Sequence, residues 1–266
     1  MRIVVLIKQV PDAAKVDIDP VTGNLRRESA DTKINPYDLH ALETALTIKE
    51  KVEGEIIVMS MGPPQAEKAL KEALMLGGDR AILLSDRAFA GSDVLATSYT
   101  LSQGLTKLSE YDLIICGKQT TDGDTAQVGP AIAEHLNLPQ ATWVTKVLAV
   151  DQNSITVRQD FGETLLDVKL DFPCLLSIEK SEEVPRLPSY SRKKQLAQEK
   201  IMVLSLADLP DQDPEKYGTI GSATRVQRIF PPQINTEKIV LEGTAAELTT
   251  EIIKILKEKK LGGQSN

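Results

Sequence analysis

The sequence is poor in cysteine, histidine, aromatic residues and long apolar runs, and each shortage excludes a class of protein. It has two cysteines and two histidines among 266 residues, so neither a disulfide framework nor a multi-histidine metal site is expected. Aromatic residues make up 4% of the chain, too few to stack the successive bases of a nucleic-acid strand. No apolar run approaches the roughly 18 residues of a membrane-spanning helix.

Positive charge is also scarce, which argues against nucleic acid as a partner. The formal net charge is −7, whereas nucleic-acid binding depends on a basic surface. Cys116 and Cys174 lie in apolar runs without a disulfide or metal-ligand spacing, as is usual in a reducing compartment. The apolar run at residues 3–7 is too short for the core of a signal peptide. These features predict a cytoplasmic protein.

Short apolar runs alternate with helical patterns along the first half of the chain. The runs lie at residues 3–7, 56–59, 81–84 and 113–116, and such runs are typical of strands buried on both faces of a parallel sheet. Between them, apolar residues recur every three or four positions, as expected for helices that cover a sheet. Four such alternations predict an α/β fold with a doubly wound, mostly parallel sheet.

Other patterns predict additions to this sheet. Alternation around Thr22-Gly-Asn24 predicts a β-hairpin insert over about residues 14–28, and period-two patterns predict antiparallel strands over about 141–178. Prolines then recur up to Pro232, and a helical apolar stripe follows. We therefore expect a nucleotide-binding domain over residues 1–185, and an extended arm with a terminal helix over 186–266 that docks on a partner.

Four polar segments are expected at the carboxyl edge of the sheet, where α/β folds bind ligands. The longest, residues 117–128, combines a glycine after a buried strand, a polar loop and a helix start, and its backbone N–H groups suit a phosphate. Taken singly, each segment is also a common turn or cap, so it is their convergence that predicts a nucleotide site. The other three segments are Lys8-Gln9, Asn35-Pro-Tyr-Asp38 and Ser60-Met-Gly-Pro63.

Two familiar phosphate motifs do not fit the chain. A Walker A loop ending in Gly117-Lys118 would need glycine at Asp112, and no Gly-x-Gly-x-x-Gly follows the first strand. Asp122 and Asp124 would repel phosphate, so ribose contact, N-capping and simple solvation stay open for them. No nucleophile–base pair is evident in the sequence. A nucleotide site without acid–base machinery suggests a carrier of a redox cofactor.

In order along nearly the whole chain, these motifs resemble those of the small (beta) subunit of electron-transferring flavoproteins. The resemblance implies a heterodimer with an alpha subunit that carries FAD. It also implies a second nucleotide in this chain, AMP in ordinary members and FAD in electron-bifurcating members. The matching segments are Val5–Asp12, Asn35–Asp38, Ser60–Pro63, Gly77–Arg80 and Gly117-Lys-Gln119 through Gln127.

The resemblance also implies functional residues. Small side chains at Gly123 and Ala126 leave room for a flavin diphosphate and favour the bifurcating type. Residues 182–190 resemble the family's partner-recognition loop, with Leu187 as the apolar anchor before Pro188, although an ordinary exposed leucine is the alternative. The implied cofactor-binding residues are Leu6, Lys8, Asn35, Pro36, Tyr37, Asp38, Met61, Gly62, Gly117, Lys118, Gln119, Thr120, Thr121, Asp122, Gly123, Asp124, Thr125, Ala126, Gln127 and Val128.

A bifurcating member would accept electrons from NADH and divide them between two routes. One leads to ferredoxin or flavodoxin, and the other leads through the alpha-subunit FAD to a flavin dehydrogenase, such as an acyl-CoA or 2-hydroxy-acid dehydrogenase. The first alternative is an ordinary AMP-binding beta subunit that passes single electrons between dehydrogenase and acceptor. The second is a stand-alone protein that binds or hydrolyses adenine nucleotides.

Overall fold

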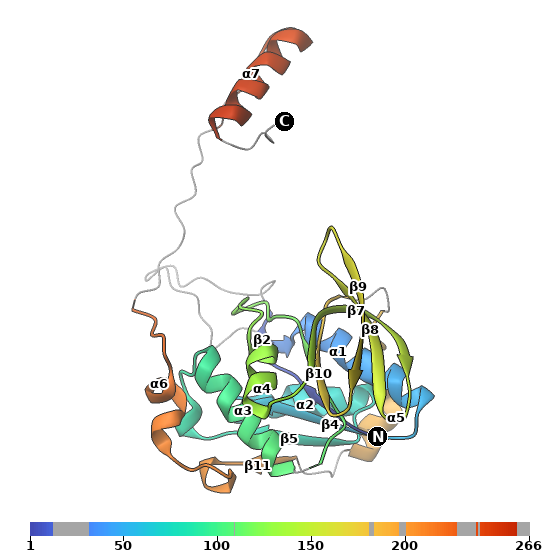
Figure 1. The fold of residues 1–266 in the computed structure, drawn as a ribbon. Helices are drawn as coiled ribbons and strands as arrows, with labels where there is room; N and C mark the ends of the chain where they lie inside the picture. The colour runs from blue at the N-terminus through green and yellow to red at the C-terminus, as the bar shows by residue number, and fades with distance from the viewer. Residues whose placement is uncertain are drawn as a thin grey trace. The chain divides into compact units, whose positions relative to one another are not determined.

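The computed structural model describes residues 1–12, 32–108, 110–180, 184–196, 201–227, 238 and 240–259. The chain divides into two compact units, residues 1–225 and residues 226–266. The first unit is an α/β fold, and the described part of the second contains the helix α7 (Ala245–Glu258) (Figure 1). Within the described residues, no helix is both long enough and apolar enough to cross a membrane.

A nine-stranded sheet forms the centre of the first unit, in the order β11-β5-β4-β1-β6-β10-β7-β8-β9. Neighbouring strands from β11 to β7 pair in parallel, and β7, β8 and β9 pair antiparallel. The predicted mostly parallel sheet with an antiparallel extension is confirmed. The strands are β1 (Arg2–Leu6), β4 (Glu55–Met61), β5 (Arg80–Leu84), β6 (Leu113–Gly117), β7 (Gln140–Val150), β8 (Ser154–Asp160), β9 (Leu165–Asp171), β10 (Cys174–Ile178) and β11 (Met202–Leu204).

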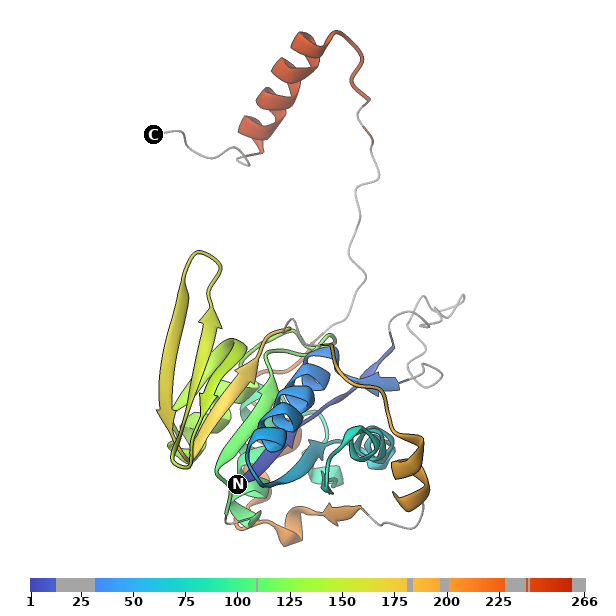
Figure 2. The same ribbon diagram turned by 90° about the vertical axis from the view of Figure 1, so that its right-hand side faces the viewer.

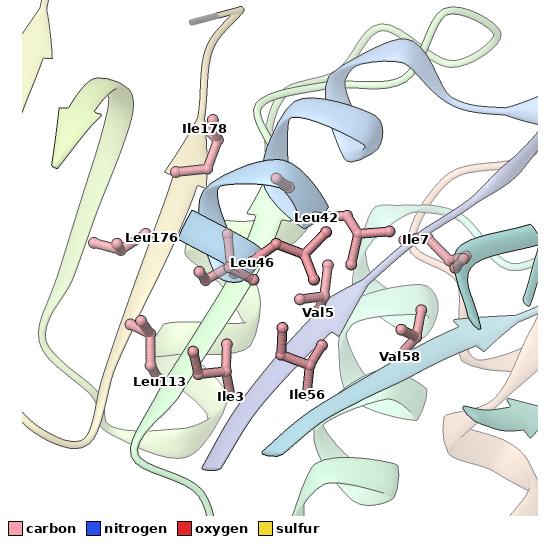
Figure 3. Close-up of a cluster of buried hydrophobic side chains, with 14 of the residues drawn as sticks. Ile3, Val5, Ile7, Leu42, Leu46, Ile56, Val58, Leu113, Leu176 and Ile178 are labelled. Carbon is pink, nitrogen blue, oxygen red and sulfur yellow. The ribbon is translucent and has the colours of Figure 1, made fainter. Parts of the chain in front are cut away.

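Helices cover both faces of the sheet, because every central strand is apolar on both sides (Figure 2). In β1, Ile3 and Val5 pack with α1 and α2, while Val4 packs with α3 and α4 (Figure 3 shows the first cluster). The helices are α1 (Pro36–Lys51), α2 (Glu67–Leu76), α3 (Val94–Leu108), α4 (Val128–Leu136), α5 (Tyr190–Gln195) and α6 (Gly218–Gly221), with short 3₁₀ turns η3 (Pro64–Ala66), η4 (Arg87–Phe89), η6 (Leu206–Asp208) and η7 (Pro214–Lys216).

Local signals placed the helix ends well. Asn35 is the N-cap residue of α1 and Pro36 is its first residue, a position that proline favours. Gly77 ends α2 with φ +142°, a backbone conformation that favours glycine. The N-cap residue of α4 is Gln127.

Two further features concern the predicted hairpin and the end of the first unit. The predicted hairpin over about residues 14–28 lies outside the described residues, although the flanking strands β2 (Gln9–Pro11) and β3 (Thr32–Ile34) pair antiparallel. The first compact unit extends to Arg225. It does so because β11 joins the sheet beside β5, and because the buried Tyr217 packs against Phe89.

Candidate nucleotide site

The strand order changes direction at β1. The chain runs from β1 to β4 and β5 on one side, and then returns through α3 to β6 on the other side of β1. In a doubly wound sheet, the carboxyl ends of the two strands at such a switch border the ligand crevice. Here those ends lead into Lys8 and Gly117, so two of the predicted segments meet at this point.

Asp38, in the first turn of α1, joins the ends of these two strands. Its Oδ2 accepts a hydrogen bond from the backbone N–H of Lys8 at 2.7 Å, and its Oδ1 accepts one from the N–H of Gly117 at 3.1 Å. The side chain is buried, and this burial raises the pKa of the carboxyl to about 7 although both N–H donors oppose the shift. Asp38 is therefore part of the frame beneath the site.

Asn35 holds the loop that follows β6. Its Nδ2 donates to the carbonyl oxygen of Gln119 at 2.8 Å, and its Oδ1 accepts from the N–H of Thr121 at 3.3 Å. Its own N–H donates to the carbonyl oxygen of Lys8 at 2.9 Å. The side chain is fully buried. An N-cap asparagine usually accepts a hydrogen bond from an N–H group in the first turn of its helix. Within the described residues, the Asn35 side chain makes no such bond to α1, because it is bonded to the loop instead.

The loop over residues 117–128 folds back on itself. The carbonyl oxygen of Thr120 accepts from the N–H of Asp124 at 2.9 Å, and the Thr120 hydroxyl oxygen accepts from the N–H of Gly123 at 3.3 Å. Asp124 and Ala126 have φ values of +52° and +55°, which non-glycine residues seldom adopt. Such conformations persist where the surroundings enforce them, and they cluster at ligand sites.

The helix α4 begins directly behind this loop. Its N-cap residue, Gln127, supplies no side-chain hydrogen bond to the first turn in the described structure, so these N–H groups remain available to a ligand. The N-terminal end of a helix attracts anions through its N–H groups and its dipole. Together with the left-handed turns of the loop, the end of α4 fits the phosphate part of a nucleotide.

Lys8 and Asp122 form an ion pair at the rim of the site. The ammonium Nζ of Lys8 lies 2.8 Å from both carboxylate oxygens of Asp122. Burial alone would raise the pKa of Asp122, but the hydrogen bond and charge of Lys8 outweigh it and lower the pKa. The sequence did not predict this ion pair, because Lys8 and Asp122 are far apart in the chain.

Lys118 has a different environment from the rest of the loop. Its Nζ lies 2.6 Å from Oε2 of Glu179 and 3.6 Å from the ring centroid of Trp143. Burial tends to raise the pKa of Glu179, and the hydrogen bond from Lys118 brings it below its ordinary value. Sequence reasoning missed Glu179 and Trp143. No local signal could have found them, since their contact with Lys118 depends on the pairing of β6, β10 and β7.

Some predicted residues lie at the ends of β1 and β4, and others lie on the segment before α5. Leu6 is buried and Met61 is partly buried on the α3/α4 side of the sheet, and the N–H of Gly62 donates to the carbonyl of Leu84 at 3.0 Å. Leu187 is 87% exposed, and it lies with Pro188 on the segment before α5.

An open depression of about 910 Å³ lies at the opposite edge of the sheet, around the amino end of β1. Its lining includes Arg2, whose guanidinium is paired with Glu55 and Glu110. It is separate from the carboxyl edge where the predicted residues converge, so it forms no part of the nucleotide site.

Comparisons with known proteins agree with this geometry. Residues 22–209 match the family model described as "Electron transfer flavoprotein domain". The chain is 44% identical over 268 residues to Protein FixA of Sinorhizobium fredii, covering 95% of this chain and 93% of that protein. It is 42% identical over 259 residues to electron transfer flavoprotein subunit beta of Clostridium acetobutylicum, with 97% and 99% covered. It is 42% identical over 264 residues to subunit CarD of the caffeyl-CoA reductase-Etf complex of Acetobacterium woodii, with 98% and 100% covered.

Proposed function

Because this chain belongs to the electron transfer flavoprotein family and matches its beta subunits, we propose that it binds FAD at residues 35–38 and 117–128. The family is flavin-associated, and its beta subunits act in electron transfer together with an alpha subunit. FAD rather than AMP, and a bifurcating rather than an ordinary role, are the parts of the proposal that go beyond membership of the family.

The single observation that carries the proposal is the loop between β6 and α4. It combines an uncapped helix start with left-handed turns at Asp124 and Ala126, and residues 121–125 are exposed. Small residues at Gly123 and Ala126 leave the space above the loop open to a ligand longer than AMP. Asn35 fixes the loop from below, so the binding groups are preorganised.

The protein's contribution to the chemistry is to bind and orient the nucleotide. Bound FAD supplies hydride exchange with NADH, and electron exchange with ferredoxin or flavodoxin and with the FAD of the alpha subunit. A relative named as a subunit of a caffeyl-CoA reductase-Etf complex supports a partner that acts on CoA esters, such as an acyl-CoA dehydrogenase. The exposure of Leu187 supports a role for residues 182–190 in contacting that dehydrogenase. We place the protein in the cytoplasm, in keeping with its two free, buried cysteines.

Nucleotide stoichiometry tests the proposal. The chain is coexpressed with its alpha subunit, the purified complex is denatured, and released FAD and AMP are quantified. We expect two FAD and no AMP per heterodimer. One FAD and one AMP would overturn the FAD assignment and establish the ordinary beta subunit, and no nucleotide beyond the alpha-subunit FAD would overturn the site itself.

A matched pair of asparagine variants locates the nucleotide. Asn35→Asp removes the donor to Gln119 and places a carboxylate beneath the phosphate loop, so the second nucleotide should be lost while the alpha-subunit FAD remains. Asn137→Gly changes the residue at the other end of α4, which has φ +53° and suits glycine, so it should keep the full stoichiometry.

A further inference from the structure

The side chain of Lys118 is directed away from the exposed part of the nucleotide loop. The lysine follows β6 directly, and only 12% of its side chain is exposed. The ammonium is held by the carboxylate of Glu179 at 2.6 Å and by the ring of Trp143, whose centroid is 3.6 Å away. Both contacts stabilise the positive charge of Lys118. They hold its ammonium against Glu179 and Trp143, on the side of the loop that faces β10 and β7.

The backbone around this cluster connects three strands. The N–H of Lys118 donates to the carbonyl of Ile178 at 2.7 Å, and the N–H of Glu179 donates to the carbonyl of Val144 at 2.9 Å. On either side of Lys118, Gly117 is held by Asp38 and Gln119 by Asn35. Lys118 is thus the point where the start of the loop is attached to the strands β10 and β7.

Trp143 has an unusual backbone conformation for so large a residue. Its φ is +56°, and the register between β7 and β8 shifts just after it, between Val144 and Lys146. A bulky residue in the left-handed region is strained, and such strain is kept where the contacts of the side chain compensate for it. Trp143 contacts Lys118, and its ring centroid lies 6.4 Å from that of Phe161 after β8.

We propose that Lys118 is a positioning residue and not a phosphate ligand, and that the Trp143–Lys118–Glu179 cluster couples the antiparallel extension to the nucleotide loop. The inference rests on the proposed nucleotide site. To reach a phosphate, Lys118 would have to leave the partly buried carboxylate of Glu179 without the ammonium that lies 2.6 Å from it, which is unfavourable. The cluster instead holds the first residues of the loop in place, so the geometry of β7 controls nucleotide affinity.

The variant Glu179→Gln distinguishes a phosphate ligand from a positioning residue, because the two roles of Lys118 predict opposite changes in nucleotide affinity. If Lys118 contacted phosphate, removing the competing carboxylate would free its charge and tighten nucleotide binding. If Lys118 positions the loop, removing its partner loosens the loop, and the dissociation constant should rise about tenfold, equivalent to about 1.4 kcal/mol. Tighter or unchanged binding would overturn the inference.

Two variants at position 143 keep the test independent of folding. Trp143→Gly removes the ring but suits a φ of +56°, so the protein should remain folded while nucleotide affinity falls by about as much as in Glu179→Gln. Trp143→Phe keeps an aromatic ring over the ammonium and should lie close to wild type. Equal affinity in wild type and Trp143→Gly would contradict the coupling.

The measurement is calorimetric titration of the nucleotide-stripped heterodimer with AMP, and with FAD in a second series. Asp167→Asn neutralises a carboxylate of the same extension, whose Oδ1 lies 2.7 Å from Nε of Arg158, and it controls for the loss of one negative charge in Glu179→Gln. Its affinity should match wild type. A wild-type heterodimer that binds neither probe at the beta site would overturn the proposed function, whereas binding that is equal in all variants would overturn the inference alone.

Trp143 is the only tryptophan of the chain, which provides a second readout. The fluorescence difference between the wild-type heterodimer and Trp143→Phe isolates its signal. We expect that signal to shift on addition of AMP, because the loop and the ring are joined through Lys118. An unchanged signal at saturating AMP would contradict the coupling.

Discussion

At the scale of single residues, Asp38 joins the ends of two strands at the candidate site. Sequence reasoning placed Asp38 among the cofactor-binding residues, and the structure places its carboxyl beneath the crevice, between the backbone N–H groups of Lys8 and Gly117. Its charge also contributes, after burial, to the raised pKa of the neighbouring Cys116 thiol. A thiol with a raised pKa is mostly protonated at neutral pH and is therefore a poor nucleophile.

The raised pKa of Asp38 predicts a specific pH dependence of stability. The folded state holds this proton up to about pH 7, whereas a carboxyl in the unfolded chain has a pKa of 3.8. The contribution of Asp38 to the free energy of unfolding is therefore fully present below about pH 4 and is lost as the pH rises through about 7. Relative to Asp38→Asn, the wild type should lose a few kcal/mol across this interval, since one pKa unit corresponds to about 1.4 kcal/mol.

Urea denaturation of both proteins between pH 4 and pH 8 measures this difference. The comparison with Asp38→Asn cancels the carboxylates whose pKa values are lowered, such as Asp122 and Glu179, because these lose stability as the pH falls. Parallel pH profiles for the two proteins would show that Asp38 titrates normally and would contradict the prediction.

At the scale of elements, α1 supports both the candidate nucleotide site and the segment before α5. Its start holds the loop through Asn35, and its middle binds Arg186. The Arg186 guanidinium lies 2.8 Å from a carboxylate oxygen of Glu43 and 2.9 Å from one of Glu50. Burial opposes ionisation of Glu43, but the hydrogen bonds from Arg186 dominate and lower its pKa.

The Arg186 ion pairs predict an effect on partner recognition. They fix the backbone directly before Leu187, since the N–H of Arg186 also donates to Glu43. Leu187 itself is 87% exposed, so an exposed apolar side chain is held on a fixed backbone. Arg186→Ala should free this backbone and raise the KM for the partner dehydrogenase about three- to tenfold, or roughly 0.6–1.4 kcal/mol. The kcat and the nucleotide content should not change.

Steady-state kinetics with the reconstituted heterodimer measures this effect, with Arg158→Ala as the matched control. Arg158 also forms a two-point pair, with Asp167 on β9, but it lies on the antiparallel extension. A KM that rises equally in both variants would point to a general charge effect and would sink the assignment to Leu187.

At the scale of the whole molecule, the chain combines a packed α/β unit with a helix that buries none of its residues. The helix α7 is well specified locally, since Thr244 and Glu247 form a reciprocal capping box with hydrogen bonds of 2.8 Å. Its apolar residues Ile252, Ile253 and Leu256 are 40–48% exposed. An amphipathic helix whose apolar residues stay partly exposed is typical of a segment that binds a partner.

Removal of residues 226–266 should therefore affect assembly and leave the first unit folded. We expect the truncated chain to keep the cooperative unfolding transition of the first unit and to bind the alpha subunit at least about tenfold more weakly, a loss of about 1.4 kcal/mol. Size-exclusion chromatography and calorimetry measure both properties. The double substitution Ile253→Ser and Leu256→Ser in the full-length chain should weaken assembly in the same direction, and unchanged affinity in both proteins would refute a role for α7.

The sequence by itself predicted the central strands, the helices between them and the position of the candidate site, because those signals are local. The apolar runs of the central strands, the Asn35-Pro36 start of α1 and the Gly77 end of α2 depend on residues within one helical turn or one strand. The glycine after β6 and the polar loop behind it were enough to indicate a nucleotide, and the order of motifs indicated the family.

Only the tertiary structure decided what the charged residues of the site do. Lys8 pairs with Asp122, Asp38 bridges two strand ends, and Lys118 pairs with Glu179. Each of these contacts joins residues at least 30 positions apart and follows from the strand order β1-β6-β10-β7. The partner of a charged residue cannot be read from the sequence, because the order of the strands in the sheet decides which residues lie close together.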